Sequence, residues 1–356
     1  MIMSEGILSL IGDTPLVKLT RVLDDAPFQL YGKLEGFNPG GSIKDRTAYS
    51  IIKRAMAEGR IDRETVIIES SSGNMGIGLA QACTYYGLKF ICVVDPKTTQ
   101  QNIQLLKAYG AQVDMVSDPD PVTREFLHAR IERVKTLMRA LPKGYWPNQY
   151  SNVFNAVAHR HTMSEIVTAL DGRVDYLFCA ASTCGTLRGC AEYIRENNLS
   201  TKIVAVDALG SVIFGGPPFK RLIPGHGAAT RPDLYLPNLA ARCIHVTDLD
   251  CIMGCRRLLR KEAIMAGGSS GAVVMALALV KDDIPRGSTC VMIFPDRGER
   301  YLDTIYSDEW VAEHFGDVAH LWEDFDLTFP ESWSEPDVWV AEEERTTILS
   351  AAVMTN

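Results

Sequence analysis

The sequence contains no long hydrophobic run and no CxxC pair. No apolar window in its 356 residues approaches the ~20 residues that a membrane-spanning helix needs. The opening segment, MIMSEGILSLIGDTP, has no basic region followed by an apolar run, so we expect no secretion signal. The nine cysteines are an odd number and lie scattered through apolar segments, which is typical of reduced thiols. These absences predict a soluble, cytoplasmic protein without a membrane partner.

Two common nucleotide-binding patterns are also missing. The chain has no GxxxxGK[ST] segment, and its glycines do not fall at GxGxxG spacing. It has no basic run either, so we expect no nucleic-acid partner. His159 and His161 share a predicted helix with Glu165 but have no further convergent ligand, so we expect no metal site.

The formal net charge of −8 comes from one end of the chain. Residues 311–356 hold eleven acidic side chains against the single base Arg345, so the remaining body is close to neutral and an anionic substrate is not excluded. Four of the five tryptophans lie in or beside this acidic extension: Trp310, Trp322, Trp333 and Trp339. We expect the extension to pack on the body or on a partner subunit, because exposed tryptophans favour aggregation.

The body of the chain alternates between strand and helix patterns. With 46% hydrophobic residues, it can bury a large core. From residue 60 onward the alternation indicates βαβ units and a mostly parallel sheet. The expected strands are residues 66–69, 90–94, 112–116, 176–180, 203–206, 243–246 and 290–294. The expected helices cover residues 74–86, 99–109, 121–140, 185–197, 248–264 and 270–281. The pattern predicts an α/β fold of two lobes with a cleft between them.

The lobes are expected to meet near residues 142–150. There Pro, Gly and Asn interrupt the periodicity, and the sequence contains no internal repeat or low-complexity tract. We expect residues 1–37 and 147–310 to form a larger lobe and residues 38–146 to form a smaller one, followed by the extension at 311–356.

One lysine follows a tight glycine loop. In GFNPGGSIKDR, Pro39 fixes one backbone dihedral while Gly40 and Gly41 allow backbone angles closed to other residues, so the loop can press against a ligand. Apolar residues then recur at helical spacing until Gly59, which places Lys44 at a loop-to-helix junction. A partly buried amine near the positive end of a helix dipole loses its proton more easily and becomes a nucleophile. Lys44 is therefore the candidate for a Schiff-base lysine, and a solvated surface lysine is the alternative.

Three further loops of small residues stand at the start of predicted helices. They are SSSGNMG at 70–76, STCGT at 182–186 and GGSSGA at 267–272. Their hydroxyls, backbone N–H groups and helix N-termini suit a carboxylate or a phosphate, although each loop alone also fits a capped helix. Four such loops, one with a lysine, fit one phosphorylated cofactor between two α/β lobes.

Taken in order, these segments resemble a known family. PGGSIKDR, SSSGN, STCGT, GGSSGA and PDRGERYLD, spread over about residues 5 to 310, resemble the fold-type II pyridoxal-phosphate enzymes of the cysteine synthase group, whose fold is tryptophan synthase beta-like. The resemblance implies pyridoxal 5'-phosphate as cofactor, a transferase that replaces a group at Cβ of an amino acid, and a homodimer. It also implies that the larger lobe binds the cofactor and that the smaller, mobile lobe grips the substrate.

The resemblance assigns roles to individual residues. Lys44 would bind the cofactor covalently, Asn74 would bond to its 3'-oxygen, and Ser269 would face its ring nitrogen. The residues that would hold the substrate carboxylate are Ser71, Ser72, Gly73, Asn74 and Gln149. Those that would hold the cofactor phosphate are Ser182, Thr183, Cys184, Gly185 and Thr186. Because a neutral hydroxyl does not keep the ring nitrogen protonated, this arrangement favours β-elimination over transamination.

Two departures from the cysteine synthase pattern put sulfide chemistry in doubt. Met75 replaces a small polar residue, and Ser182 and Cys184 replace glycines. The segments YWPNQY, AVDALGSVIFGG, PGHGA and PDRGERYLDTIYSDEW instead resemble a branch that joins O-phospho-L-serine and L-glutamate through an aminoacrylate, on the way to diaminopropionate for siderophores. The alternatives are a cysteine or cystathionine synthase with a sulfur nucleophile, and a cofactor-binding regulatory protein without turnover.

A phosphorylated donor would require its own anion site. A phosphate group carries about two negative charges near neutral pH and needs a cation and several hydrogen-bond donors. The candidates are Arg130, Tyr150 and Ser182. For Arg130 the alternative is a surface ion pair with Glu125 or Glu132.

Overall fold

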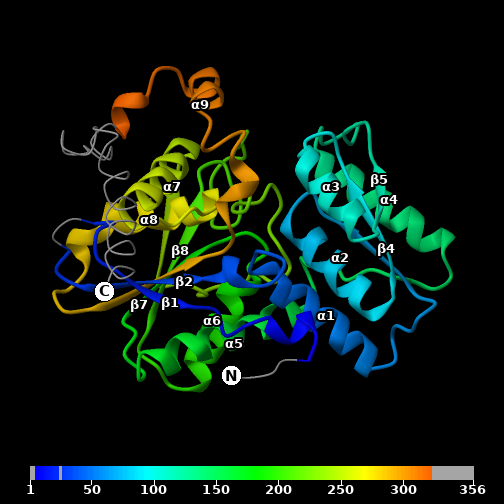
Figure 1. Cartoon of the computed structure of the whole chain (residues 1–356), viewed down its shortest axis with the longest axis horizontal. Helices are drawn as coiled ribbons and strands as arrows, with labels where there is room; N and C mark the ends of the chain where they lie inside the picture. Colours follow the sequence, from blue (N-terminus) through cyan, green and yellow to red (C-terminus); the bar gives the residue numbers. More distant parts are fainter. Residues whose placement is uncertain (1–4, 24–25, 323–356) are drawn as a thin grey trace, which may run out of the picture.

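The computed structural model describes residues 5–23 and 26–322, and its strands form two separate sheets (Figure 1). The strands are β1 (Leu16–Leu19), β2 (Gln29–Leu34), β3 (Val66–Ser70), β4 (Lys89–Val94), β5 (Gln112–Met115), β6 (Gly144–Tyr145), β7 (Tyr176–Ala180), β8 (Lys202–Ala208), β9 (Arg242–Val246) and β10 (Thr289–Phe294). The larger sheet has the order β1-β2-β10-β7-β8-β9 and the smaller has the order β5-β4-β3-β6. Only the β1–β2 pair of these sheets is antiparallel. The predicted α/β class with mostly parallel sheets is confirmed.

Helices surround both sheets. The α-helices of the described residues are α1 (Lys44–Ala57), α2 (Asn74–Tyr86), α3 (Gln100–Ala108), α4 (Phe126–Ala140), α5 (Val153–Ala169), α6 (Gly185–Glu196), α7 (Asp248–Glu262), α8 (Gly268–Val280) and α9 (Asp308–Phe315). Short 3-10 helices are η1 (Ile7–Leu10), η2 (Glu35–Phe37), η3 (Lys281–Asp283), η4 (Gly298–Tyr301) and η5 (Ala319–Leu321). None of the helices in this described part is long and apolar enough to cross a membrane.

We call the elements around the larger sheet the large lobe. Two helix pairs cover its opposite faces: α7 and α8 lie on one side of the strands, and α5 and α6 on the other (Figure 1). The α7–α8 pair crosses at glycines, since a Cβ on Gly271 would lie 2.0 Å from the carbonyl oxygen of Cys251. This close approach fixes the start of α8, and with it Ser269, beneath the carboxyl ends of the strands.

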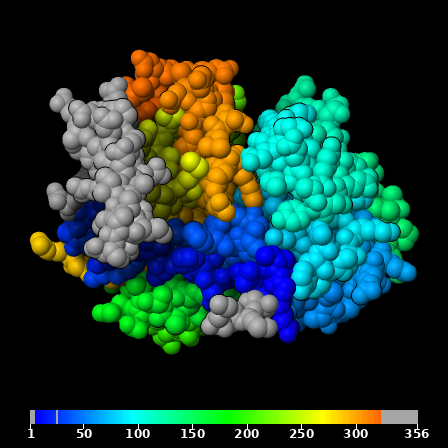
Figure 2. Space-filling model, viewed as in Figure 1, coloured from blue at the N-terminus to red at the C-terminus, as the bar shows by residue number. Residues whose placement is uncertain are grey.

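The elements around the smaller sheet form the small lobe. One face of α1 packs Ala48, Ile51 and Ile52 into the same core as α2 and the small sheet. The other side of α1 contacts α5 of the large lobe, so Lys44, the first residue of α1, stands where the lobes meet. Figure 2 shows a hollow between the cyan surface of the small lobe and the orange surface of the large lobe. The residue limits predicted for the lobes stay a prediction.

Some elements differ from the expectations. The strands β1, β2 and β6 were not predicted from the sequence, and the helix before the lobe boundary was predicted to begin at residue 121. In the structure α4 starts at Phe126, because Asp120 Oδ1 accepts hydrogen bonds from the backbone N–H groups of Val122 and Thr123 and closes a turn there. Arg124 follows with φ of 60°, which no α-helix allows.

The beginning of the C-terminal extension packs on the large lobe. Val311 is fully buried, and Trp310, Phe315 and Trp322 lie against the core formed by α7, α8 and the large sheet. The Arg256 guanidinium lies 4.3 Å from the centroid of the Trp322 ring. Trp333 and Trp339, predicted to pack in the same way, lie outside the described residues.

Truncation after Asp308 is expected to destabilise the protein. It removes the buried Val311 together with three half-buried aromatic side chains, which together stabilise the fold by roughly 3 kcal/mol. A loss of that size lowers the melting temperature by about 4 °C in a protein of this size. Truncation after Trp322 is the matched control, because it keeps these contacts. Equal melting temperatures for the two truncated proteins would show that residues 309–322 are dispensable.

Candidate active site

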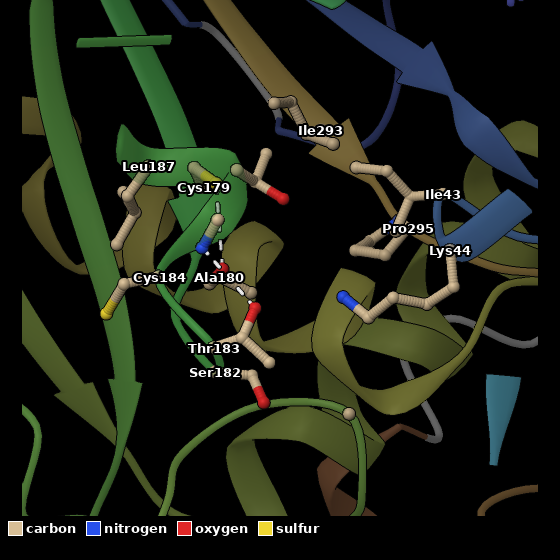
Figure 3. A pocket seen from close by; sticks show the side chains of 13 residues that line it. Ile43, Lys44, Cys179, Ala180, Ser182, Thr183, Cys184, Leu187, Ile293 and Pro295 are labelled. Carbon is tan, nitrogen blue, oxygen red and sulfur yellow. Dashed lines mark hydrogen bonds between the residues drawn. The ribbon is translucent and has the colours of Figure 1, made fainter. Parts of the chain in front are cut away.

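Lys44 stands at the N-terminus of α1 and its side chain points into a cavity. In Figure 3 the amine extends toward the loop that carries Ser182 and Thr183, on the opposite wall. Burial lowers the pKa of this amine, and the nearby Cys179 and Asp296 act in the opposite direction. A larger share of the amine is therefore neutral and nucleophilic than for an exposed lysine.

The loop opposite Lys44 is a cup at the start of α6. The cavity brings together the five residues predicted to hold a phosphate, which are Ser182, Thr183, Cys184, Gly185 and Thr186. Cys184 has φ of 63°, and its sulfur points away from Lys44 (Figure 3). Backbone N–H groups at the start of a helix point toward an anion placed there. The loop thus offers hydroxyls, N–H groups and the positive end of a helix dipole.

Asn155 of α5 supports this cup from behind. Its amide nitrogen donates to Thr183 Oγ1 at 3.0 Å and to the carbonyl oxygen of Gln149 at 2.8 Å. A Cβ on Gly185 would lie 2.1 Å from Asn155 Oδ1, so only glycine fits at the first position of α6. Asn155 therefore joins the phosphate loop to the segment predicted to grip the substrate.

Asn74 connects the two lobes near Lys44. Its amide nitrogen donates to Asp296 Oδ2 at 2.7 Å, and its amide oxygen accepts a hydrogen bond from Arg300. Asp296 is fully buried, also accepts from the Tyr301 hydroxyl at 2.5 Å, and leaves Oδ1 without a described partner. Burial raises the pKa of Asp296, while Tyr301, Asn74 and the positive charges nearby lower it. Arg300 also donates to the carbonyl oxygen of Gly40, so it ties the loop before Lys44 to the large lobe.

Asp296, Arg300 and Tyr301 were not predicted from the sequence to be functional residues. All three lie in PDRGERYLD, which was used only for the resemblance. The signal available was a buried strand, β10, that ends at Phe294, two residues before an acidic residue. Because strand ends in α/β folds carry functional side chains, the position alone marks Asp296 as a candidate.

Ser269 and Ser270 begin α8 on the far wall of the site. Both are buried, and Ser270 Oγ has no described hydrogen-bond partner. Gly225, which lines the Lys44 cavity, faces Ser269: a Cβ at Gly225 would lie 3.3 Å from Ser269 Oγ. The missing side chain leaves space beside that hydroxyl.

The residues predicted to hold a substrate carboxylate lie in or beside the small lobe, and none of them lines the Lys44 cavity itself. Ser71 Oγ accepts from the backbone N–H of Gly76 at 2.9 Å and from that of Gly73 at 3.3 Å, which organises the start of α2. Ser72 offers its carbonyl oxygen to Asn102. Gln149 is buried, and its backbone N–H donates to Glu69 Oε2 at 3.2 Å. Burial raises the pKa of Glu69 to about 7, although its hydrogen bonds and Arg130 lower it.

Arg130 is buried in the small lobe. Its Nε lies 3.2 Å from Asp95 Oδ2, so the alternative of a surface ion pair with Glu125 or Glu132 is wrong. Its Nη1 has no described hydrogen-bond partner. Burial raises the pKa of the half-buried Tyr150, and Arg130 acts against this rise. The cation and the phenol thus lie within electrostatic range of each other.

His159, one of the two histidines considered as metal ligands, has other partners. His159 is buried and contacts Thr47 and Thr162, while Glu165 pairs with Arg46 and Lys33. The described residues contain no group of three or more His, Cys, Asp or Glu side chains that could hold a metal ion.

Comparisons with known proteins place the chain in a family. Residues 7–296 match the family described as "Pyridoxal-phosphate dependent enzyme". The chain is 46% identical to N-(2-amino-2-carboxyethyl)-L-glutamate synthase of Ralstonia nicotianae, over 87% of this chain and 91% of that protein. This match confirms the resemblance to that branch.

Solved structures show the same fold. O-acetylserine dependent cystathionine beta-synthase of Helicobacter pylori is 32% identical with a TM-score of 0.80, covering 86% of this chain and 100% of that one. O-acetyl serine sulfhydrylase isoform 3 of Entamoeba histolytica is 32% identical, also with a TM-score of 0.80, covering 86% and 92%.

The residues of the site fit the cofactor of this family. A lysine with a lowered pKa faces a cup of hydroxyls and helix N–H groups, as an aldehyde-bearing phosphate ester requires. Gly225, which lines the cavity, has no side chain that could lie against the Ser269 hydroxyl. The predicted tryptophan synthase beta-like fold and the predicted cofactor are therefore confirmed. The chain belongs to the family of pyridoxal-phosphate-dependent enzymes.

Proposed function

We propose that this enzyme joins O-phospho-L-serine and L-glutamate to give N-(2-amino-2-carboxyethyl)-L-glutamate and phosphate. The identity of 46% to a synthase of that name, over most of both chains, supports the proposal. The observation in the structure that carries it is the buried Arg130, whose Nη1 has no described hydrogen-bond partner and whose charge lowers the pKa of Tyr150. A neutral acetyl leaving group does not need such a cation, whereas a phosphate does. As the resemblance implies, the product would lead to L-2,3-diaminopropionate for siderophores.

The residues around Lys44 would carry the chemistry. Bound pyridoxal phosphate supplies an electron-withdrawing ring that weakens the Cα–H bond of the amino acid. Lys44 Nζ takes the Cα proton, for which its lowered pKa keeps it neutral. Asn74 and the Ser182–Thr186 loop would hold the cofactor in place, and Ser269 would face its ring nitrogen. Ser71, Ser72, Gly73 and Gln149 hold the substrate carboxylate, which aligns the Cα–H bond with Lys44.

Group transfer then takes place at Cβ of the donor. Arg130, Tyr150 and Ser182 stabilise the phosphate as the Cβ–O bond breaks and the oxygen keeps the electron pair. The amine of L-glutamate forms the new Cβ–N bond and gives up one proton, which the departing phosphate takes up. Cα regains a proton from Lys44 Nζ, so that atoms and charge balance.

Offering the purified enzyme O-phospho-L-serine with either L-glutamate or sulfide tests the proposal. We expect the mass of N-(2-amino-2-carboxyethyl)-L-glutamate and one phosphate per product. The solved relatives are named for sulfur chemistry, so cysteine is the competing product. Cysteine formation from sulfide without any product from L-glutamate would make this chain a cysteine synthase.

We further propose a homodimer in the cytoplasm. A groove of about 980 Å³ lies between α1 and α5, and its walls include Tyr49, Phe154 and Val157, so a second copy would cover apolar surface there. All nine cysteines are free, which fits a reducing compartment. Sedimentation of the purified protein at twice the chain mass of 39.3 kDa would support the dimer.

A further inference from the structure

Residues 221–227 form a loop on the large-lobe wall of the active site. Gly225 of this loop lines the same cavity as Lys44 and Ser182. The backbone N–H of Gly227 donates to the carbonyl oxygen of Ala181 at 2.6 Å, directly before the phosphate cup. The loop therefore lines the cavity and is hydrogen-bonded to the segment that leads into the phosphate cup.

The start of the loop is fixed by one carboxylate. The backbone N–H groups of Leu222 and Ile223 donate to the two oxygens of Asp248, at 2.8 Å and 3.1 Å. Because Asp248 is the first residue of α7, this chelate anchors the backbone next to Arg221 to a rigid helix. The position of the Arg221 side chain is thereby restricted.

Arg221 uses little of its hydrogen-bonding capacity. It is half-buried, and its Nη1 donates to the carbonyl oxygen of His226 at 3.1 Å. It forms no ion pair with any of the residues that the structure describes. A guanidinium has five N–H donors, and here the one described acceptor is uncharged.

The Arg221 guanidinium lies beside the part of the loop that is attached to the phosphate cup, since a Cβ on Gly227 would clash with Arg221 Nη1. Arg130 and Arg221 both lower the pKa of Tyr150 against the larger effect of burial, so two cations from opposite lobes act on one phenol. Asp95 partly neutralises Arg130, whereas no described carboxylate does so for Arg221. Arg221 is therefore a cation that one further anionic group could pair with.

We propose that Arg221 binds the side-chain carboxylate of the acceptor amino acid and so selects a dicarboxylic acceptor. This inference rests on the proposed function, in which the donor phosphate belongs to Arg130. A second cation is needed because the acceptor brings two carboxylates to a site built around one phosphate. The planar fork of an arginine matches a carboxylate with two parallel hydrogen bonds, which a lysine does not reproduce.

Replacing Arg221 by methionine tests the inference. In Arg221→Met we expect the KM for L-glutamate to rise by about ten- to a hundredfold, with kcat changed far less. Single-turnover release of phosphate from O-phospho-L-serine, measured without an acceptor, should stay within about twofold, because the donor does not contact Arg221. The preference for L-glutamate over L-glutamine should be lost, and Arg221→Lys should restore part of it. Lys220→Met is the matched control, since Lys220 is the adjacent, exposed cation, and it should leave all these quantities unchanged.

The outcomes separate this inference from the proposed function. An unchanged KM for L-glutamate in folded Arg221→Met protein overturns the inference and leaves the reaction intact. Slower phosphate release with an unchanged KM for L-glutamate overturns it too, because Arg221 then serves the donor. A wild-type enzyme that forms no product from L-glutamate overturns the proposed function, and the inference with it. If Arg221→Met does not fold, Arg221→Lys decides, because loss of the planar fork should still raise the KM for L-glutamate.

Discussion

Lys44→Ala is expected to reduce turnover by at least about a thousandfold, because in the proposed mechanism Lys44 is both the covalent attachment point of the cofactor and the base that acts at Cα. The residues that line the cavity include one lysine, Lys44. Its amine extends toward the loop that carries Ser182 and Thr183 (Figure 3). Its lowered pKa arises from burial, which a lysine at the surface does not experience. Wild-type protein should therefore purify yellow, and borohydride reduction should fix the cofactor on the peptide that contains Lys44.

Lys53→Ala is the matched control for this experiment. Lys53 lies in the same helix, α1, but its ammonium lies over the Tyr49 ring in the groove on the other side of the helix. This variant should keep wild-type turnover and the same labelled peptide. A label on any lysine other than Lys44 would overturn the assignment, and full activity of Lys44→Ala would do so as well.

The parts of the fold that the sequence predicted share a local signal. The strands and helices from residue 60 onward alternate along the chain, so each is visible in its own hydrophobic pattern. The loop that contains Lys44 is visible for the same reason, since PGGS precedes a helix by a few residues. In contrast, β2 pairs with β10, although more than two hundred residues separate them in the chain. No local pattern carries that pairing, and both N-terminal strands were missed.

The same contrast between local patterns and long-range contacts explains which residues of the candidate site were predicted from the sequence. Lys44, Asn74, Ser182 and Ser269 each lie in a loop whose composition indicates an anion or cofactor site. The bonds from Asn74 to Asp296 and Arg300 span 222 and 226 residues, so they exist only once the lobes are assembled. For Arg130 the local sequence was misleading, because the nearby Glu125 and Glu132 are not its ion-pair partners. In the folded protein its partner is Asp95, so a test of Arg130→Ala must allow for the loss of this buried ion pair.

Arg130→Ala should reduce kcat/KM for O-phospho-L-serine by about ten- to a hundredfold, which corresponds to the loss of ~1.4–2.7 kcal/mol for one charge-assisted contact. The reduction for O-acetyl-L-serine should be much smaller, because its leaving group carries no phosphate charge. The substitution also leaves the buried Asp95 without its cation, so some folded protein is expected to be lost. The ratio of kcat/KM between the two donors is unaffected by that loss, because both donors meet the same active molecules.

The control for Arg130 is Arg133→Ala in the same helix. Arg133 is exposed and pairs with Asp114 through Nε at 2.9 Å and Nη2 at 2.7 Å, so its removal should leave the donor ratio unchanged. Arg130→Lys keeps the positive charge and should recover part of the activity with O-phospho-L-serine, although it loses the fork geometry. Equal effects of Arg130→Ala on both donors would mean that Arg130 only supports the small lobe. A wild-type preference for O-acetyl-L-serine would mean that the cation near Tyr150 does not serve a phosphate, and the donor assignment would then be wrong.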